Sequence, residues 1–200
     1  MNFKHVPKHY ASRSHAKMQE VLLEPSADAP ELHYHMIRGG KDQRNITVWE
    51  PGKVGREYIK TYGHYHVGDL DETYWILLGK GVALLQKLAL DENGKMIADV
   101  VEEFRAVPVK AGDDLYMPSG HGHLVVNTGS TFLVTADNSP VDFEERDPVS
   151  LPGHADYELV KQMGGFAYFV VEHEGKPALL KNPKYKEIKK ADLGGLPVVS

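Results

Sequence analysis

The sequence of 200 residues contains no cysteine, so disulfide bonds and thiolate metal sites are both excluded. It has no apolar run long enough to cross a membrane as a helix, and its first residues lack the apolar stretch of a secretory signal peptide. The formal charge of -5 gives the surface as a whole no attraction to nucleic acid or to an anionic membrane. From these absences we expect a soluble, cytoplasmic protein that binds neither.

Short apolar or alternating runs, separated by glycine and proline turns, dominate the chain from Ile46. This pattern of short runs and turns favours an all-β sandwich or barrel. The runs are Ile46–Trp49, Glu57–Thr61, Tyr74–Leu78, Val82–Lys87, Asp99–Val107, Asp114–Met117, His123–Asn127 and Thr131–Ala136. Asp91–Lys95 contains the asparagine and glycine of a hairpin turn. A short helix over Ala155–Gln162 and a hairpin of Phe166–Glu172 with Pro177–Leu180 are expected to follow.

The two ends of the chain differ from this strand-rich part. Residues 1–44 are the least regular segment, in which Ser14–Leu23 is expected to form a short helix that begins near Ser14. The length suits a single domain, or one domain with extensions. We therefore expect an N-terminal extension over residues 1–44 that packs on a barrel over residues 45–185, followed by a tail over residues 186–200.

Two short histidine motifs together predict one metal site. In the first, Gly-His-Tyr-His, His64 and His66 lie two residues apart, so on a strand both point to the same face. Glu72 begins the next predicted strand. The second motif, Gly-x5-Pro-x-Gly-x2-His-x3-Asn over residues 112–127, offers His123 as a third imidazole. Three imidazoles and a carboxylate suit a first-row transition metal and leave coordination positions open for a ligand.

Other histidines near these motifs are weaker candidates. His121 forms a second His-x-His with His123, but the Pro-x-Gly-x2-His pattern selects His123, so His121 is expected in a loop at the pocket mouth. His33 and His35 form a further doublet that has no carboxylate or partner motif at a useful distance. For these two histidines we expect surface or strand-packing roles.

The pair of motifs, in this order and on this strand pattern, resembles the metal-binding motifs of the cupin superfamily. The resemblance implies a double-stranded β-helix, the jelly-roll barrel, with minor helices in this chain. It also implies that His64, His66, Glu72 and His123 converge inside the barrel. Five residues separate His66 from Glu72, more than is usual in cupins, and an insertion in that loop would account for the difference.

A closer resemblance is carried by segments on both sides of the histidines. Pro-Gly-Lys-Val-Gly-Arg-Glu at 51–57, Glu-Thr-Tyr at 72–74, Gly-Lys-Gly at 79–81, Gly-His-Ala-Asp-Tyr at 153–157 and Asn-Pro-Lys-Tyr at 182–185 are similar to the cupin-type glucose-6-phosphate isomerases known chiefly from archaea. This resemblance implies a homodimer and iron(II), with nickel, manganese or zinc also chemically acceptable. The substrate contacts that it implies are Thr47, Thr61, Gly63, Tyr74, His154 and Tyr157.

Thr61 conflicts with simple strand alternation, which places it on the face opposite His64, whereas the resemblance places it at the phosphate. A β-bulge near Tyr62 and Gly63 would reconcile the two, because glycine permits the required backbone conformation. Lys53 offers a positive charge for a phosphate, although a surface lysine after a turn is the commoner case.

The resemblance implies a metal-dependent isomerase that interconverts glucose 6-phosphate and fructose 6-phosphate, a step of glycolysis and gluconeogenesis. A divalent metal would stabilise charge on the sugar oxygens. Glu72 is the candidate base that removes the C2 proton and returns it at C1, and Tyr74 lies beside it on the same strand face. Because a metal-bound carboxylate is a weak base, Glu72 would have to release or share the metal. Otherwise a metal-assisted hydride shift is the remaining route.

The phosphate would be held by hydroxyl and backbone N–H groups, since the chain has no Gly-rich phosphate loop of the P-loop or dinucleotide type. Two other functions stay open. An iron-dependent cupin dioxygenase would use the same ligands, consume oxygen and need an apolar or aromatic-acid pocket without a phosphate site. A non-enzymatic sugar- or metal-binding cupin would keep the ligands and show no turnover.

Overall fold

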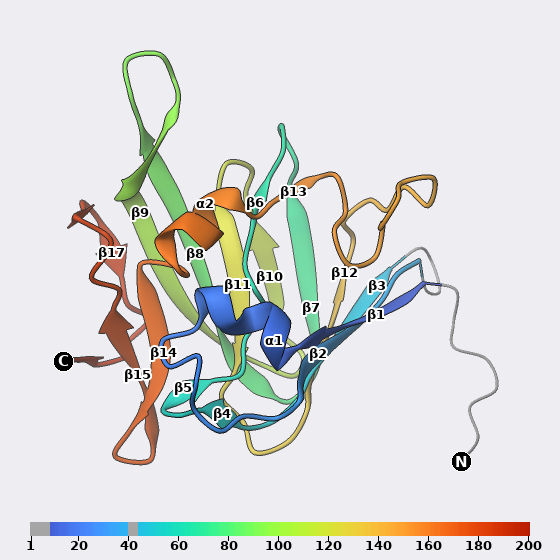
Figure 1. The fold of residues 1–200 in the computed structure, drawn as a ribbon, viewed down its shortest axis with the longest axis horizontal. Helices are drawn as coiled ribbons and strands as arrows, with labels where there is room; N and C mark the ends of the chain where they lie inside the picture. Colours follow the sequence, from blue (N-terminus) through green and yellow to red (C-terminus); the bar gives the residue numbers. More distant parts are fainter. Residues whose placement is uncertain (1–8, 40–43) are drawn as a thin grey trace.

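The computed structural model describes residues 9–39 and 44–200, and its main body consists of two β-sheets that share one hydrophobic core. The larger sheet has six antiparallel strands in the order β1-β2-β3-β12-β7-β10 (Figure 1). These strands are β1 (Tyr10–Ser14), β2 (Leu32–Ile37), β3 (Asn45–Trp49), β12 (Leu133–Asp137), β7 (Glu72–Leu78) and β10 (Asp114–Met117). Burial alternates along β3, as expected for a strand with one face toward the core: Asn45, Thr47 and Trp49 are buried, and the residues between them are only half-buried.

The second sheet contains the long β8–β9 hairpin, with β11 on one side and short C-terminal strands on the other. Its strands are β11 (Gly122–Asn127), β8 (Lys80–Leu90), β9 (Met96–Lys110), β16 (Glu187–Ile188) and β17 (Ala191–Asp192). The expected hairpin turn is present: the Asp91 N–H donates to the Lys95 carbonyl at 2.8 Å and Gly94 has a φ of 78°. The hairpin projects beyond the rest of the barrel (Figure 1).

From β7 to β12 the chain passes repeatedly between the two sheets. β7, β10 and β12 belong to the first sheet, whereas β8, β9 and β11 belong to the second. This wrapping is that of a jelly-roll barrel. The predicted all-β cupin barrel is therefore confirmed.

Two smaller sheets complete the structure. One pairs β13 (Ala155–Asp156) with β6 (Tyr65–His66). The other has the order β18-β15-β14-β5-β4. Its strands are β18 (Val198–Val199), β15 (Lys176–Lys181), β14 (Tyr168–His173), β5 (Glu57–Tyr58) and β4 (Lys53–Val54). The β14–β15 pair is the hairpin expected after the second helix.

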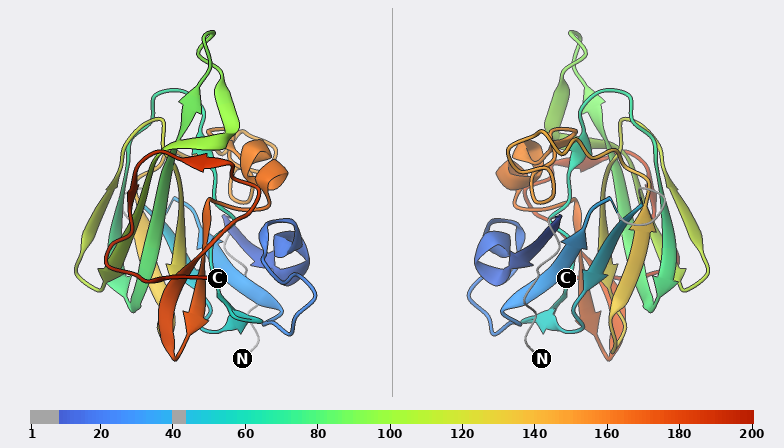
Figure 2. Two further views of the ribbon diagram at one scale, coloured as in Figure 1. Left: turned by 90° about the vertical axis from the view of Figure 1, so that its left-hand side faces the viewer. Right: turned by 90° about the vertical axis from the view of Figure 1, so that its right-hand side faces the viewer.

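The helices are shorter than the sequence suggested. The first is α1 (His15–Met18), which continues as the 3-10 helix η1 (Gln19–Val21). The second, α2 (Glu158–Met163), begins three residues later than expected, because Ala155 and Asp156 pair with β6 instead. Both helices lie on the same side of the barrel (Figures 1 and 2). None of the helices in the described ranges is long and apolar enough to span a membrane.

A buried ion pair fixes the N-terminal helices against the barrel. Lys60 Nζ lies 2.6 Å from Glu57 Oε1 and donates to the Val21 carbonyl at 2.6 Å, while the Leu23 N–H donates to Glu57 Oε2. Both charged side chains are almost fully buried. The division into an extension, a barrel and a tail stays a prediction. Within the expected extension, β1 and β2 contact the barrel as strands of the larger sheet.

Candidate metal centre and active site

The structure brings His64, His66, Glu72 and His123 together, and one ligand atom from each lies within 4.8 Å of all the others. The four residues come from different parts of the barrel. His66 lies on β6, Glu72 is the first residue of β7, and His123 lies on β11. His64 forms an isolated β-bridge with His123.

A β-bulge sets the direction of His64. Lys60 pairs with Val126 and His64 pairs with His123, so four residue steps on one strand oppose three on the other. The extra residue is the bulge expected just before His64. Gly63 has a φ of 84°, which glycine adopts without strain.

The four side chains fit a divalent first-row metal ion. His64 Nε2, His66 Nε2, His123 Nε2 and Glu72 Oε2 are buried. Within the described part of the chain none makes a hydrogen bond of acceptable geometry, although Glu72 Oε2 lies close to the nitrogens of His66 and His123. Buried polar atoms without partners are costly. Three imidazole nitrogens and a carboxylate oxygen are a donor set that iron, manganese, nickel or zinc accepts, and coordination would supply the missing partner for each atom.

The hydrogen bond of His66 fixes its tautomer. His66 Nδ1 lies 2.9 Å from the Leu70 carbonyl, which can only accept, so Nδ1 carries the proton and Nε2 is free to bind a metal. Burial lowers the pKa of His66, but the neighbouring Glu72 carboxylate and the Leu70 carbonyl outweigh burial and raise it.

The two oxygens of Glu72 face different partners. Oε2 lies 3.1 Å from His123 Nε2 and 3.3 Å from His66 Nε2, whereas Oε1 accepts a hydrogen bond from Ser139 Oγ at 2.8 Å. Burial by itself would raise the pKa of Glu72, but the imidazoles of His123 and His66 hold it well below its usual range. Glu72 is therefore ionised at neutral pH.

A buried polar network behind Glu72 was not predicted from the sequence. Ser139 Oγ also lies 2.6 Å from Asp137 Oδ1, which accepts from Asn45 Nδ2 at 2.6 Å, and Arg38 lies 3.3 Å from Asp137 Oδ2. Burial, and then the charge of Glu72, raises the pKa of Asp137. The sequence contained one indication of this network. Asp137 directly follows a predicted strand and lies two residues after Thr135, so strand alternation points both side chains to the same face.

Three of the predicted substrate contacts lie beside the ligand cluster. The Tyr74 ring lies 5.8 Å from the His123 ring, the Tyr157 ring 5.5 Å from the His64 ring, and the His154 ring 5.7 Å from the His66 ring. Burial, and then the charge of Glu72, raises the pKa of Tyr74 well above its usual value, so its hydroxyl stays protonated. Burial and the nearby His66 lower the pKa of His154.

The threonines are placed differently. Thr61 Oγ1 accepts from the Val125 N–H at 3.0 Å, and the Thr61 N–H donates to the Val125 carbonyl at 3.0 Å. Thr61 thus holds the bulged segment against β11, and its hydroxyl also donates to the Val125 carbonyl at 3.5 Å. Thr47 is buried on the inward face of β3, opposite Thr135 of β12.

The weaker candidates lie outside the cluster. His121 Nδ1 lies 3.3 Å from the Ser119 carbonyl, in the loop before β11. His35 contacts Glu50 and Tyr10, and Lys53 forms a 2.7 Å ion pair with Glu172. The buried His33 ring lies on β2, and its Nε2 is 3.2 Å from His15 Nδ1.

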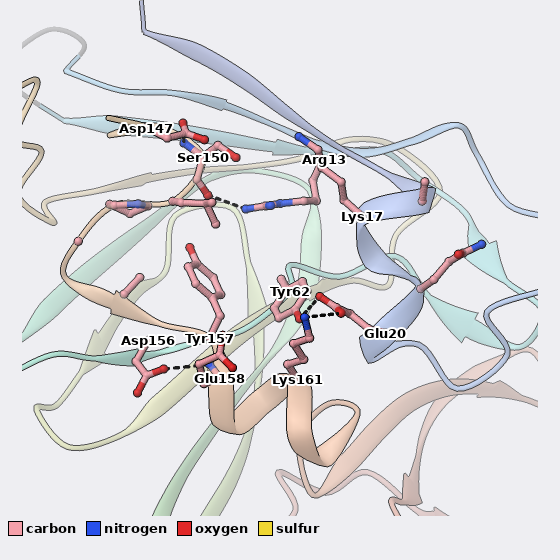
Figure 3. Close-up of a pocket in the computed structure, with 16 residues that line it drawn as sticks. Arg13, Lys17, Glu20, Tyr62, Asp147, Ser150, Asp156, Tyr157, Glu158 and Lys161 are labelled. Atoms are coloured by element: carbon pink, nitrogen blue, oxygen red, sulfur yellow. Dashed lines mark hydrogen bonds and ion pairs between the residues drawn. The ribbon is translucent and has the colours of Figure 1, made fainter. Parts of the chain in front are cut away.

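A cavity of about 810 Å³ lies next to the site, between α1 and the start of α2 (Figure 3). Its lining includes Arg13, Tyr62, Ser150 and Tyr157, but none of the four clustered ligand residues. The Tyr157 ring lies 5.5 Å from both the Tyr62 ring and the His64 ring, so Tyr157 borders this cavity and the ligand cluster.

Fold and site together define a cupin, a jelly-roll barrel that gathers three histidines and one glutamate in its interior. A family model described as glucose-6-phosphate isomerase (GPI) matches residues 31–187. The chain belongs to this family, as the sequence predicted.

Curated relatives named glucose-6-phosphate isomerase include two archaeal proteins. The protein from Thermococcus onnurineus (strain NA1) is 36% identical over 141 residues, and that from Pyrococcus abyssi (strain GE5 / Orsay) is 34% identical over 141 residues. Each alignment covers 70% of this chain and 62% of the relative, so the chain spans less than two thirds of their length. A solved structure described as a predicted oxalate decarboxylase from Thermotoga maritima is 27% identical, covers 52% of this chain and 76% of its own, and has a TM-score of 0.35.

Proposed function

We propose that this chain is a metal-dependent isomerase that interconverts glucose 6-phosphate and fructose 6-phosphate. The observation that carries the proposal is the convergence of four buried donor atoms within 4.8 Å in a chain of the glucose-6-phosphate isomerase family. A sugar phosphate is the proposed partner, with no nucleic acid or membrane. A homodimer and a cytoplasmic location, both expected from the sequence, belong to the same proposal.

The proposed metal ligands are His64, His66, Glu72 and His123, with iron(II) as the resident ion and nickel, manganese or zinc as chemically acceptable substitutes. When bound, such an ion would supply Lewis-acid stabilisation of the charge that develops on the sugar oxygens.

Glu72 is the proposed base. Its lowered pKa keeps the carboxylate ionised and so able to accept a proton, and it would remove the proton from C2 of glucose 6-phosphate and return it to C1. Its Oε1 faces away from the imidazoles and is oriented by Ser139, so the two oxygens can divide the roles of ligand and base. A hydride shift from C2 to C1 is the alternative, and loss of a C2 deuterium label to solvent during turnover would exclude it, because a migrating hydride does not exchange with water.

The other proposed contacts orient the sugar. The protonated hydroxyl of Tyr74 can donate to a sugar oxygen beside Glu72, and the largely neutral imidazole of His154 can exchange a proton with one. Thr47, Thr61, Gly63 and Tyr157 are the groups proposed to hold the phosphate.

The test is turnover of fructose 6-phosphate, coupled to oxidation of glucose 6-phosphate. The protein is assayed as isolated, after chelation, and after iron, manganese, nickel or zinc is restored, beside His64→Ala. Oxygen consumption is followed in the same samples. Metal-dependent turnover that His64→Ala abolishes supports the proposal, whereas folded, metal-loaded protein without turnover contradicts it.

A further inference from the structure

The groups proposed to hold the phosphate are all uncharged, although a phosphate monoester carries nearly two negative charges at neutral pH. A buried anion needs a compensating charge or several strong donors. Among the lysines around the barrel, Lys53 is paired with Glu172, Lys60 with Glu57, and Lys161 with Glu20. Their charges are already balanced.

Arg13 differs from these lysines. It lies on β1, in register with Tyr34 of β2, and its side chain is buried with 6% of the residue exposed. Within the described residues no carboxylate approaches its guanidinium to ion-pair distance, whereas Arg38 and Arg56 both have such partners. A buried cation without a counter-ion is costly, and a bound anion offsets that cost.

Neutral acceptors hold the guanidinium in place. Arg13 Nε donates to Tyr34 Oη at 3.2 Å, and Arg13 Nη2 donates to the Ser150 carbonyl at 2.6 Å. These bonds use two of the five N–H groups of a guanidinium, and the remaining ones, on Nη1 and Nη2, can reach an incoming oxyanion. The charge is therefore fixed in position before any ligand arrives.

Tyr157 lines the cavity together with Arg13 and also lies beside the ligand cluster. The Tyr157 ring lies 5.5 Å from the His64 ring, and in Figure 3 the side chain points from the start of α2 toward the Arg13 guanidinium. Tyr34 Oη, which accepts from Arg13, also accepts from the Tyr62 N–H at the β-bulge. Arg13 is thus connected to the segment that carries Gly63 and His64.

Within the described residues, no carboxylate around the cavity forms an ion pair with Arg13, and the negative charge of Asp147 acts on it over a longer distance. Asp147 Oδ1 accepts from the Ser150 N–H, Asp156 Oδ1 accepts from the Glu158 N–H, and Glu20 binds Tyr62 and Lys161. These three carboxylates have partners of their own, and the fourth at the cavity, that of Glu158, is exposed.

We propose that Arg13 is the cationic centre of an anion site in this cavity and binds the phosphate of the sugar phosphate beside Tyr157. That the anion is the substrate's phosphate rests on the proposed function, but anion binding itself does not. Arg13 precedes residues 31–187, the segment that matches the family model.

The test is calorimetric titration of the full chain with inorganic phosphate, fructose 6-phosphate and unphosphorylated fructose. Arg13→Gln is expected to weaken binding of both phosphate ligands about tenfold or more, because a charge-assisted contact is lost. Arg13→Lys, which keeps the charge but loses the planar fork, is expected to bind with intermediate affinity. Lys95→Met, at an exposed lysine of the β8–β9 turn outside this cavity, is the matched control and should bind like the wild type.

The variants also separate this site from the proposed activity. If the chain is an isomerase, Arg13→Lys should raise KM for fructose 6-phosphate much more than it lowers kcat. Arg13-dependent phosphate binding by a chain without isomerase turnover would uphold this site and contradict the proposed function. Undetectable phosphate binding by the wild type, or wild-type affinity in both Arg13 variants, would overturn the site.

Discussion

Ser139 Oγ lies 2.8 Å from Glu72 Oε1, so the proposed base is oriented by a hydroxyl on its side away from the imidazoles. The same hydroxyl lies 2.6 Å from Asp137 Oδ1. A hydroxyl has one proton to donate, so it cannot donate to both carboxylates. Asp137 Oδ1 also accepts from Asn45 Nδ2 and from the Ser139 N–H, so the Ser139 hydroxyl is free to donate to Glu72.

Replacing Ser139 with alanine should therefore weaken metal binding as well as catalysis. Loss of a hydrogen bond to a metal-binding carboxylate costs about 10- to 100-fold in metal affinity, and kcat should fall with it. Competition with a chromogenic chelator measures the affinity. Ser130→Ala, at an exposed serine, is the control. Equal affinities in the two variants would show that Ser139 does not orient Glu72.

The two histidines of His-Gly-His should behave in opposite ways. His123→Ala removes a clustered ligand atom, so we expect loss of stoichiometric metal binding and of turnover. His121→Ala changes a loop histidine whose ring contacts the Ser119 carbonyl, so metal content should stay at the wild-type level. Metal analysis of both purified variants provides the comparison. Metal loss in His121→Ala alone would mean that the wrong histidine was assigned.

Substitution of Gly63 by alanine should destabilise the protein more than the same substitution at Gly68, although both glycines have a positive φ. A Cβ at Gly63, where φ is 84°, would lie 3.0 Å from Phe166 Cε1 and 3.3 Å from Leu124 Cβ. Gly68 has a φ of 75° with no atom within 4 Å of the added Cβ. Alanine at Gly68 should cost about 1–2 kcal/mol of stability, and alanine at Gly63 should cost more and displace His64. Thermal unfolding and metal affinity test this, and equal effects would contradict it.

His33 should make the protein less stable in acid. His15 Nε2 lies 2.9 Å from the Pro25 carbonyl and therefore donates, so His15 Nδ1 accepts the proton of His33 Nε2 at 3.2 Å. His33 Nδ1 is buried without a partner in the described part of the chain. Burial, and then the charge of His15, lowers the pKa of His33 to about 4.

Because the unfolded chain binds this proton more readily, the contribution of His33 to stability is complete above pH 6.5 and is lost as the pH falls toward 4. The shift corresponds to roughly 3 kcal/mol. The free energy of unfolding is measured with denaturant at a series of pH values, on chelator-treated protein so that metal release has no effect. As the pH falls, it should decrease less steeply for His33→Gln than for the wild type. Identical slopes between these pH values would exclude this role.

The barrel and its histidine cluster were predictable because their signals are local. Alternation marks a strand such as β3 without knowledge of its partner, and the asparagine and glycine near residue 94 mark a turn. The spacing of His64 and His66 gives their common face in the same way. The bulge before His64 was predictable because the conflict at Thr61 required one and Gly63 could accommodate it.

The N-terminal strands, the network behind Glu72 and the position of Arg13 were not predictable, because they depend on long-range contacts that no local sequence pattern encodes. β1 and β2 are strands because they pair with each other and with β3, and the residues around them resembled an irregular extension. Asp137 becomes a partner of Glu72 only through Ser139, 67 residues away from Glu72 in the sequence. Arg13 meets Ser150 across 137 residues. Such contacts follow from strand register, which a single sequence does not specify.

The most direct test of the central claim is a titration of chelator-treated protein with iron(II), with bound metal and fructose 6-phosphate turnover measured in the same samples. Both quantities should rise together and saturate at one ion per chain, and His123→Ala should show neither. Full turnover in protein shown to be free of metal, or saturation with metal and no turnover, would contradict the account.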